Sequence, residues 1–84
     1  MENLNKKIID ELTTIVKEVL GKDDIYLTSS TTAYDVPGWD SLSHVQILYK
    51  CELQWGIRLS LKELSSLNNV GDLVDIIVKY QNNK

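Results

Sequence analysis

A turn passes directly into an apolar-patterned helix in the segment Val36-Pro37-Gly38-Trp39-Asp40-Ser41-Leu42-Ser43-His44-Val45. Pro37 fixes φ and Gly38 permits a positive φ, so together they predict the turn. Asp40 is a good N-cap, because its carboxylate can accept hydrogen bonds from the first-turn N–H groups. The pattern therefore predicts a helix that begins at Ser41, with the serine side chain pointing outward and Leu42 starting a buried stripe.

The predicted position of Ser41 suits a phosphate ester. A helix N-terminus carries about half a positive charge and N–H groups without intrahelical partners, so a phosphate on the Ser41 hydroxyl would be stabilised there. The simpler interpretation is that Asp40 and Ser41 only cap a helix. An Asp-Ser-Leu tripeptide does not choose between the two, so the rest of the chain has to decide.

The composition limits the possible classes of protein. A chain of 84 residues, 43% apolar and 25% charged, predicts one small globular domain spanning residues 1–84, with its core at about 4–80. The net charge of −3 and the lack of a basic patch argue against nucleic-acid binding. A single cysteine excludes an intrachain disulfide, the spacings of a four-ligand zinc site are absent, and no metal is expected. With no signal-peptide run and no apolar stretch of about 20 residues, we expect a cytoplasmic monomer that does not insert into membranes.

The first half of the chain predicts a long helix and a long loop. Apolar residues recur at helical spacing from Leu4 to Leu20, and Gly21 then ends the pattern. Residues 22–39 carry no helical period, and a loop of this length is uncommon unless it is functional or well packed. The residues spaced to anchor it on the core are Ile25, Leu27, Tyr34 and Val36.

The second half predicts three more helices. The second helix runs from Ser41 to about Leu53 and is apolar around most of its circumference. Such a helix is either central in the bundle or presents apolar surface to a partner, and in a small domain both can hold. One stripe comprises Leu42, Val45, Leu48 and Tyr49, and the other comprises Ile47, Cys51 and Trp55. After the break at Gly56, Ser60 and Glu63 form a capping box for a short helix. Asn69 caps the last helix, whose inner face comprises Val70, Leu73, Val74, Ile77 and Tyr80. The expected fold is all-α: a small four-helix bundle, three longer helices and one short one, with a long loop between the first two.

This order of elements resembles the acyl carrier protein family and its peptidyl carrier relatives over roughly residues 4–80. The resemblance rests on Gly38-Trp39-Asp40-Ser41-Leu42, on the apolar pattern that follows it, on Trp55-x-Ile57-x-Leu59 and on Asn69-Val70-x-Asp72-Leu73. Each segment alone is weakly specific, but together and in this order they are quite specific. The resemblance implies that Ser41, within the motif Asp40-Ser41-Leu42, is esterified by 4′-phosphopantetheine from coenzyme A. The thiol of that arm would hold an acyl or aminoacyl group as a thioester.

The same resemblance suggests that an acyl chain could slip between the second and third helices. Burying each methylene is worth about 0.8 kcal/mol, so several carbons would gain a few kcal/mol, less the cost of opening the bundle. The candidate lining residues are Leu48, Cys51, Leu59, Leu64 and Leu67. Without cargo these side chains are simply core.

The second helix departs from many fatty-acid carriers, which present acidic residues to their enzymes. Here the polar strip expected in solvent comprises Ser43, Gln46, Lys50 and Gln54, and only Glu52 nearby is acidic. The candidate partner-binding residues are Trp39, Ser43, His44, Gln46, Lys50 and Leu53. Trp39 has an alternative interpretation as ordinary packing of the loop on the helix. We infer a dedicated fatty-acid or polyketide-type pathway, with a stand-alone peptidyl carrier as the alternative. The partners implied are a phosphopantetheinyl transferase, and a ligase, ketosynthase or acyltransferase.

Two rival classes compete with the carrier. An enzyme would use Ser41 and His44, which share a helix face at i, i+3, but no orienting third group, oxyanion hole or preceding strand is evident. Cys51 is a poor nucleophile candidate, because an apolar mid-helix thiol is usually buried and inert. We therefore expect no enzymatic activity. The second rival is a helical interaction module whose serine stays unmodified.

Overall fold

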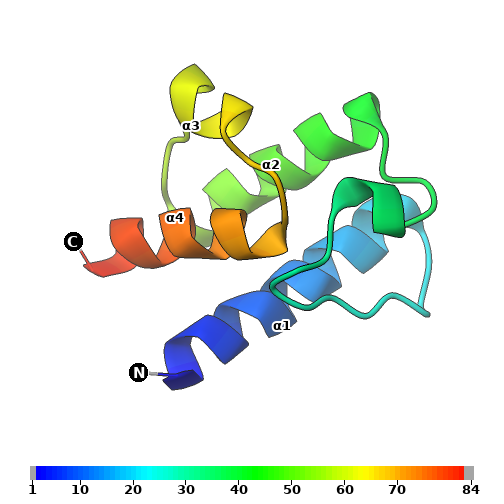
Figure 1. Cartoon of the computed structure of the whole chain (residues 1–84), viewed down its shortest axis with the longest axis horizontal. Helices are drawn as coiled ribbons and strands as arrows, with labels where there is room; N and C mark the ends of the chain where they lie inside the picture. The colour runs from blue at the N-terminus through cyan, green and yellow to red at the C-terminus, as the bar shows by residue number, and fades with distance from the viewer. Residues whose placement is uncertain (1, 83–84) are drawn as a thin grey trace.

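The computed structural model describes residues 2–82, and it confirms the all-α prediction with three longer helices and one short helix. The elements in chain order are α1 (Glu2–Leu20), the 3₁₀ turn η1 (Ala33–Asp35), α2 (Ser41–Trp55), α3 (Leu61–Ser65) and α4 (Val70–Asn82). Figure 1 shows α2 and α4 returning in the opposite direction to α1. Contacts between helices are concentrated where α1 meets α2 and where α1 meets α4, so α1 lies at the centre of the bundle.

Helix α1 buries one face, as its periodicity predicts. Ile8, Leu12 and Val16 are almost completely buried and lie at i, i+4 and i+8. The helix ends at Leu20, and Gly21 follows in the left-handed conformation while the N–H of Lys22 returns to the carbonyl of Lys17. This confirms the predicted termination.

The stripe of α2 that faces the core is Ile47, Cys51 and Trp55, as predicted, and α2 extends two residues beyond the expected Leu53. The other predicted stripe is mostly wrong. Leu48 is buried, but Leu42, Val45 and Tyr49 are exposed at 69%, 63% and 61%. The reason is that α1 covers only one side of α2, so a helix that is apolar almost all round leaves one apolar stripe in solvent.

The loop before α2 is packed through two of its four expected anchors and partly through a third. Leu27 and Val36 are buried and Ile25 is half-buried, but Tyr34 is completely exposed, which corrects the prediction for that residue. Tyr34 lies in η1, a single 3₁₀ turn whose described residues include none that is buried. An aromatic side chain on such a turn is not directed to the core by its neighbours.

The same loop is also joined to the start of α4 through the backbone. The N–H groups of Val70 and Gly71 donate to the carbonyls of Thr31 and Ser29, both at 2.7 Å. These N–H groups belong to the first turn of α4, where no intrahelical acceptor exists. A Cβ at Gly71 would lie 2.7 Å from the Ser29 oxygen, so only glycine permits this approach. We call these two contacts the α4 clip.

Candidate functional site

The turn before Ser41 forms as its sequence predicts. The N–H of Trp39 donates to the carbonyl of Val36 at 3.1 Å, with Pro37 and Gly38 between them. Gly38 has φ of +93°, the conformation that the third position of a type II turn requires. The Lys22 ammonium group also donates to the Pro37 carbonyl at 3.1 Å. The chain therefore enters α2 along a fixed path.

Asp40 caps α2, as predicted. Its Oδ1 accepts from the backbone N–H of Ser43 at 2.9 Å, and its backbone is extended. Hydrogen bonds from Ser43, first from its backbone and then from its side chain, lower the pKa of the Asp40 carboxyl below its ordinary value. The Ser43 hydroxyl donates to the Gly38 carbonyl at 2.9 Å. Ser43, a predicted partner contact, thus has a local role in holding the turn against α2.

Ser41 lies inside this hydrogen-bonded segment without taking part in it. Its side chain is exposed, and within residues 2–82 no hydrogen bond involves its hydroxyl. An exposed hydroxyl on a small residue at the start of a 15-residue helix leaves room for a phosphopantetheine ester without moving a neighbour. The Asp40 carboxylate already lies at the positive N-terminal end of α2. The exposure of the Ser41 hydroxyl therefore supports the fit of the ester more strongly than the helix dipole does.

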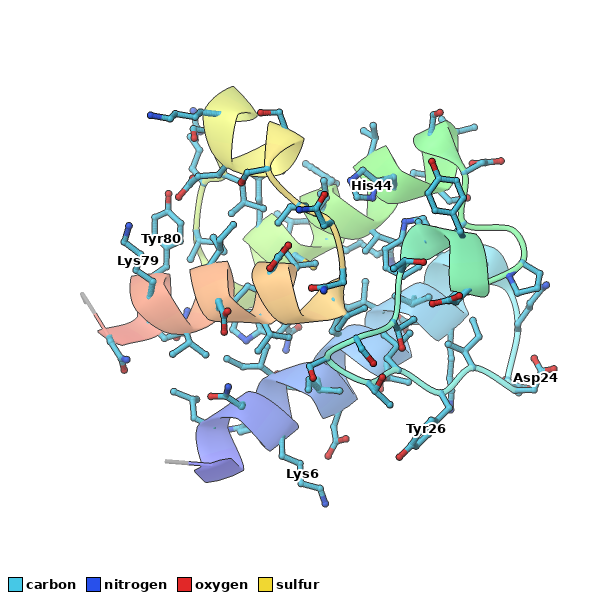
Figure 2. All side chains as sticks on the ribbon, viewed as in Figure 1. Lys6, Asp24, Tyr26, His44, Lys79 and Tyr80 are labelled. Carbon is cyan, nitrogen blue, oxygen red and sulfur yellow. The ribbon has the colours of Figure 1, made fainter. Side chains whose placement is uncertain are left out.

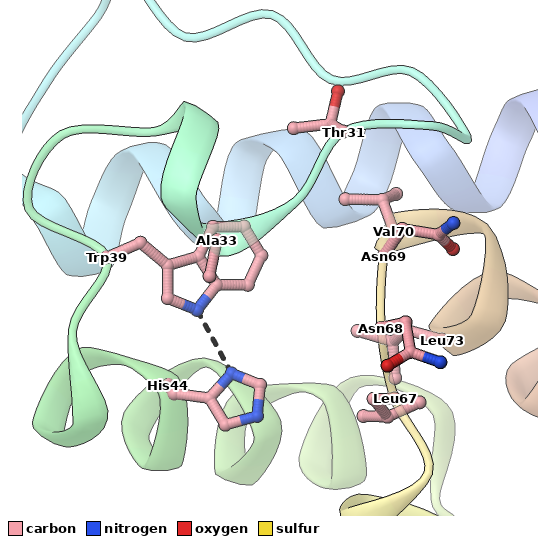
Figure 3. A pocket seen from close by; sticks show the side chains of 9 residues that line it. All are labelled: Thr31, Ala33, Trp39, His44, Leu67, Asn68, Asn69, Val70 and Leu73. Carbon is pink, nitrogen blue, oxygen red and sulfur yellow. Dashed lines mark hydrogen bonds between the residues drawn. The ribbon is translucent and has the colours of Figure 1, made fainter.

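Trp39 and His44 contact each other across the cap. The indole Nε1–H donates to Nδ1 of His44 at 3.0 Å, and the two ring centroids are 6.1 Å apart (Figure 3). Both side chains are half-buried, and burial lowers the pKa of His44 below its ordinary value. Because Trp39 occupies Nδ1, this nitrogen cannot act as a base toward Ser41.

The five candidate acyl-lining residues fall into three groups. Leu48, Leu59 and Leu64 line an apolar pocket of about 190 Å³ between α2 and α3. Leu67 lines a separate small cavity of about 50 Å³ beside Trp39 and His44. Cys51 is fully buried in the core, where burial and then the Glu52 carboxylate raise the pKa of its thiol to about 12.

An apolar stripe runs along the solvent face of α2 from the first residue after Ser41. It comprises Leu42, Val45, Tyr49 and Leu53, each more than 60% exposed, and we call it the α2 stripe. Gln46 and Lys50 are exposed on the same helix. Glu52 is the one acidic residue of α2, and its carboxylate accepts from the N–H of Leu59 at 2.8 Å. Beyond the Asp40 cap, the exposed surface of α2 is therefore apolar with one lysine, Lys50, whose ammonium group lies 3.9 Å from the Glu18 carboxylate.

Two further features of the described residues bear on function. Among residues 2–82, no cluster of three or more histidine, cysteine, aspartate or glutamate side chains could hold a metal ion. Within the same range, no helix combines the length and apolar character that crossing a bilayer requires.

Comparison with known proteins identifies the family. Residues 10–77 match the family described as "Phosphopantetheine attachment site". The acyl carrier protein of Rhodococcus erythropolis is 35% identical over 81 residues, which cover 96% of this chain and 89% of that protein. A meromycolate extension acyl carrier protein of Mycolicibacterium smegmatis is 32% identical over 81 residues, covering 96% of this chain and 82% of that protein.

A solved structure agrees with these relatives. The solution NMR structure of a holo acyl carrier protein from Geobacter metallireducens superposes with a TM-score of 0.83 at 41% identity, covering 89% of this chain and 86% of the other. The resemblance first drawn from the segment around Ser41 is confirmed by the whole chain. This helical bundle belongs to the acyl carrier protein family, whose cofactor is a covalently attached 4′-phosphopantetheine.

Proposed function

We propose that Ser41 is the residue that carries the phosphopantetheine arm. The observation that carries this proposal is the exposed Ser41 hydroxyl without a hydrogen bond, inside a turn that Asp40, Ser43 and Gly38 hold rigid. When bound, the arm supplies a thiol that holds an acyl group as a thioester. The residues around Ser41 support a carrier role without catalysis, because the nearest histidine has its Nδ1 occupied by Trp39.

We further propose that the chain serves a dedicated fatty-acid or polyketide-type pathway. The α2 stripe and Lys50 favour partner enzymes that present apolar surface with little positive charge, since apolar contacts and charge complementarity both select partners. The partners would be a phosphopantetheinyl transferase and acyl-loading or acyl-processing enzymes of the ligase, ketosynthase or acyltransferase type. An aminoacyl cargo is the second candidate, favoured by the same lack of exposed acidic residues on α2.

The pocket between α2 and α3 supports temporary shielding of an acyl chain. Leu48, Leu59 and Leu64 meet there, and the contact from Glu52 to the Leu59 N–H holds one wall. We propose Leu67 as a contact nearer the arm and Cys51 as core that supports the pocket from below. Partner contacts are proposed at Trp39, His44, Gln46, Lys50 and Leu53, with Ser43 mainly holding the turn.

Intact-protein mass spectrometry tests the attachment site. The apo protein is incubated with coenzyme A and a broad-specificity phosphopantetheinyl transferase, beside Ser41→Ala and the matched control Ser43→Ala. We expect the wild type and Ser43→Ala to gain one phosphopantetheine group and Ser41→Ala to gain none. Loading of a folded Ser41→Ala protein would refute the assignment, and failure of the wild type with two different transferases would favour an unmodified interaction module.

A further inference from the structure

The contact between Trp39 and His44 fixes which imidazole nitrogen carries the proton. The indole nitrogen of tryptophan can only donate, so Nδ1 of His44 must offer its lone pair at 3.0 Å. A neutral imidazole with an acceptor at Nδ1 has its hydrogen on Nε2. His44 is therefore held as the tautomer in which Nε2–H is a hydrogen-bond donor.

That donor has no partner within residues 2–82 and reaches solvent. No hydrogen bond to Nε2 of His44 is found in this range, although the side chain is half-buried. In the same range, every buried side-chain nitrogen or oxygen atom has a hydrogen-bond partner. Because Nε2 of His44 has none, it is not a buried atom. Figure 3 shows the ring with Nδ1 toward the indole and its other nitrogen turned away from it. His44 thus presents one oriented and unused donor.

The surroundings of this donor suit a neutral polar ligand. The small cavity of about 50 Å³ lies between α2, the loop and the connection from α3 to α4. Its polar lining comes from Thr31, Asn68 and Asn69, and no lining residue other than His44 is titratable. The hydrogen bond that Nδ1 accepts from Trp39 requires a neutral imidazole, and burial lowers the pKa of His44, which favours the same form. A neutral donor among amides and a hydroxyl matches a carbonyl oxygen better than an anion.

His44 also lies one helical turn after Ser41, on the same face of α2. We propose that His44 is a binding residue for the phosphopantetheine arm, donating from Nε2 to a carbonyl oxygen of the arm or of the thioester at its end. This proposal rests on the attachment at Ser41. Trp39 is the positioning residue, because its indole selects the tautomer that makes the donation possible.

The alternative is that Trp39 and His44 only fasten the loop to α2. Two substitutions separate the roles. Asparagine at position 44 can place an acceptor near the location of Nδ1 but is too short to place a donor at Nε2. Glutamine is longer and can place an amide N–H near the location of Nε2. We therefore expect His44→Gln to keep contact with the arm and His44→Asn to lose it, each compared only in protein whose fold is confirmed by circular dichroism and whose attached arm is confirmed by mass.

Nuclear magnetic resonance on ¹⁵N-labelled apo, holo and acyl-holo protein, each confirmed by mass, gives the test. In the apo form we expect a neutral ring protonated at Nε2. In the holo form we expect nuclear Overhauser contacts between the ring and the arm, and exchange of the Nε2 proton slowed several-fold, up to about tenfold. Contacts present in the holo form indicate an arm amide, whereas contacts confined to the acyl-holo form indicate the thioester carbonyl.

The outcomes that overturn the proposal are equally defined. If the His44 signals are identical in apo, holo and acyl-holo protein, Trp39 and His44 only join the loop to α2 and do not bind the arm. An arm whose contacts with the Trp39 indole and the rest of the cavity lining persist unchanged in His44→Asn would show that Nε2 is not the donor. A raised His44 pKa on loading, with no contact to the arm, would indicate attraction to the phosphate instead. If mass spectrometry shows no arm on the wild type, the attachment at Ser41 has failed and not the inference about His44.

Discussion

The Tyr80 hydroxyl donates to Oε1 of Glu63 at 2.8 Å, and the same oxygen accepts from the backbone N–H of Ser60 at 3.0 Å. Figure 2 shows Tyr80 extending from α4 toward α3. One carboxylate oxygen therefore completes the capping box of α3 and joins that short helix to α4. Helix α3 has only five residues, and so short a helix depends on such contacts for its position.

Replacing Tyr80 with phenylalanine should loosen α3 selectively. We expect backbone amides of residues 63–67 to exchange faster with deuterium, while those of the α1 core change little, because the substitution removes only the hydroxyl contact to Glu63. The matched control is Tyr34→Phe, the same change at a completely exposed side chain. Equal protection of α3 in the wild type and Tyr80→Phe would show that packing alone holds this helix.

Acid should weaken the fold through two caps. Backbone hydrogen bonds from Ser60 and the contact from Tyr80 lower the pKa of Glu63, and Ser43 lowers the pKa of Asp40. A carboxyl group whose pKa is lower in the folded state stabilises the protein above its unfolded-state pKa, and this stabilisation is lost as the pH falls through the folded-state value. The loss should begin below the ordinary values of 4.5 and 3.8.

Urea denaturation across acidic pH measures this effect. We expect Glu63→Gln to show a shallower fall of the midpoint than the wild type, because one of the two groups no longer titrates. Asp24→Asn removes a negative charge from the exposed loop and serves as the control. A wild-type midpoint that stays constant down to pH 2 would contradict the assignment.

Gly71→Ala should destabilise the protein in spite of being a helix-favouring change. The added Cβ would lie 2.7 Å from the Ser29 carbonyl, which also accepts from Gly71. Overpacking costs about 1–3 kcal/mol and alanine regains about 1 kcal/mol of helix propensity, so we expect a net loss of up to about 2 kcal/mol. Thermal denaturation would show it, beside Asp75→Ala on the exposed face of α4 as a control. A rise in stability would mean that the loop at Ser29 can shift and make room for the added Cβ.

The α2 stripe should matter to partners and not to folding. Leu53 is 65% exposed, so Leu53→Glu leaves the core intact and places a carboxylate in the stripe. We expect kcat/KM for loading by a phosphopantetheinyl transferase to fall about three- to tenfold, the range of a moderate interface residue. Tyr26→Glu makes a comparable change on the loop, where the side chain is 84% exposed and points away from the bundle (Figure 2). Equal losses in both variants would assign the effect to net charge.

Cys51 should stay unreactive while the arm reacts. Its side chain is fully buried and its thiol has a pKa raised to about 12, so it offers almost no thiolate at pH 8. We expect a maleimide to leave the folded apo protein unmodified and to add once to the holo protein. Cys51→Ala holo protein, whose arm carries the remaining thiol, should react at the same rate. Fast modification of apo protein would show that the core opens.

The sequence predicted well wherever a local rule decided the outcome. The cap at Asp40, the capping box of Ser60 and Glu63 and the end of α1 at Gly21 each depend on neighbours within a few residues, and all were confirmed. An exposed apolar face on α2 was one of two open interpretations, but the predicted burial of the stripe beginning at Leu42 was wrong. Periodicity separates the faces of a helix but does not say which of two apolar faces its neighbours cover. The prediction that Tyr34 anchors the loop was wrong for a related reason. An irregular loop has no periodicity that shows which side chains point toward the core.

The contact between Trp39 and His44 was also missed, although a signal for it existed. A half-buried indole needs a hydrogen-bond acceptor, and His44 is an acceptor within reach across the cap. Sequence spacing alone did not reveal it, because the two residues lie five positions apart across the junction of a turn and a helix. The α4 clip could not be predicted from the sequence, because it joins backbone groups about forty residues apart.

The Ser41 hydroxyl makes no hydrogen bond within residues 2–82, and this has a consequence for the order of folding and modification. The hydrogen bonds that shape the entry to α2 are made by Asp40, Ser43, Lys22 and the backbone of the turn, and none of them uses the Ser41 hydroxyl. With the arm on Ser41, as proposed above, we expect folding not to require loading, so that a newly made chain can fold before it meets its transferase.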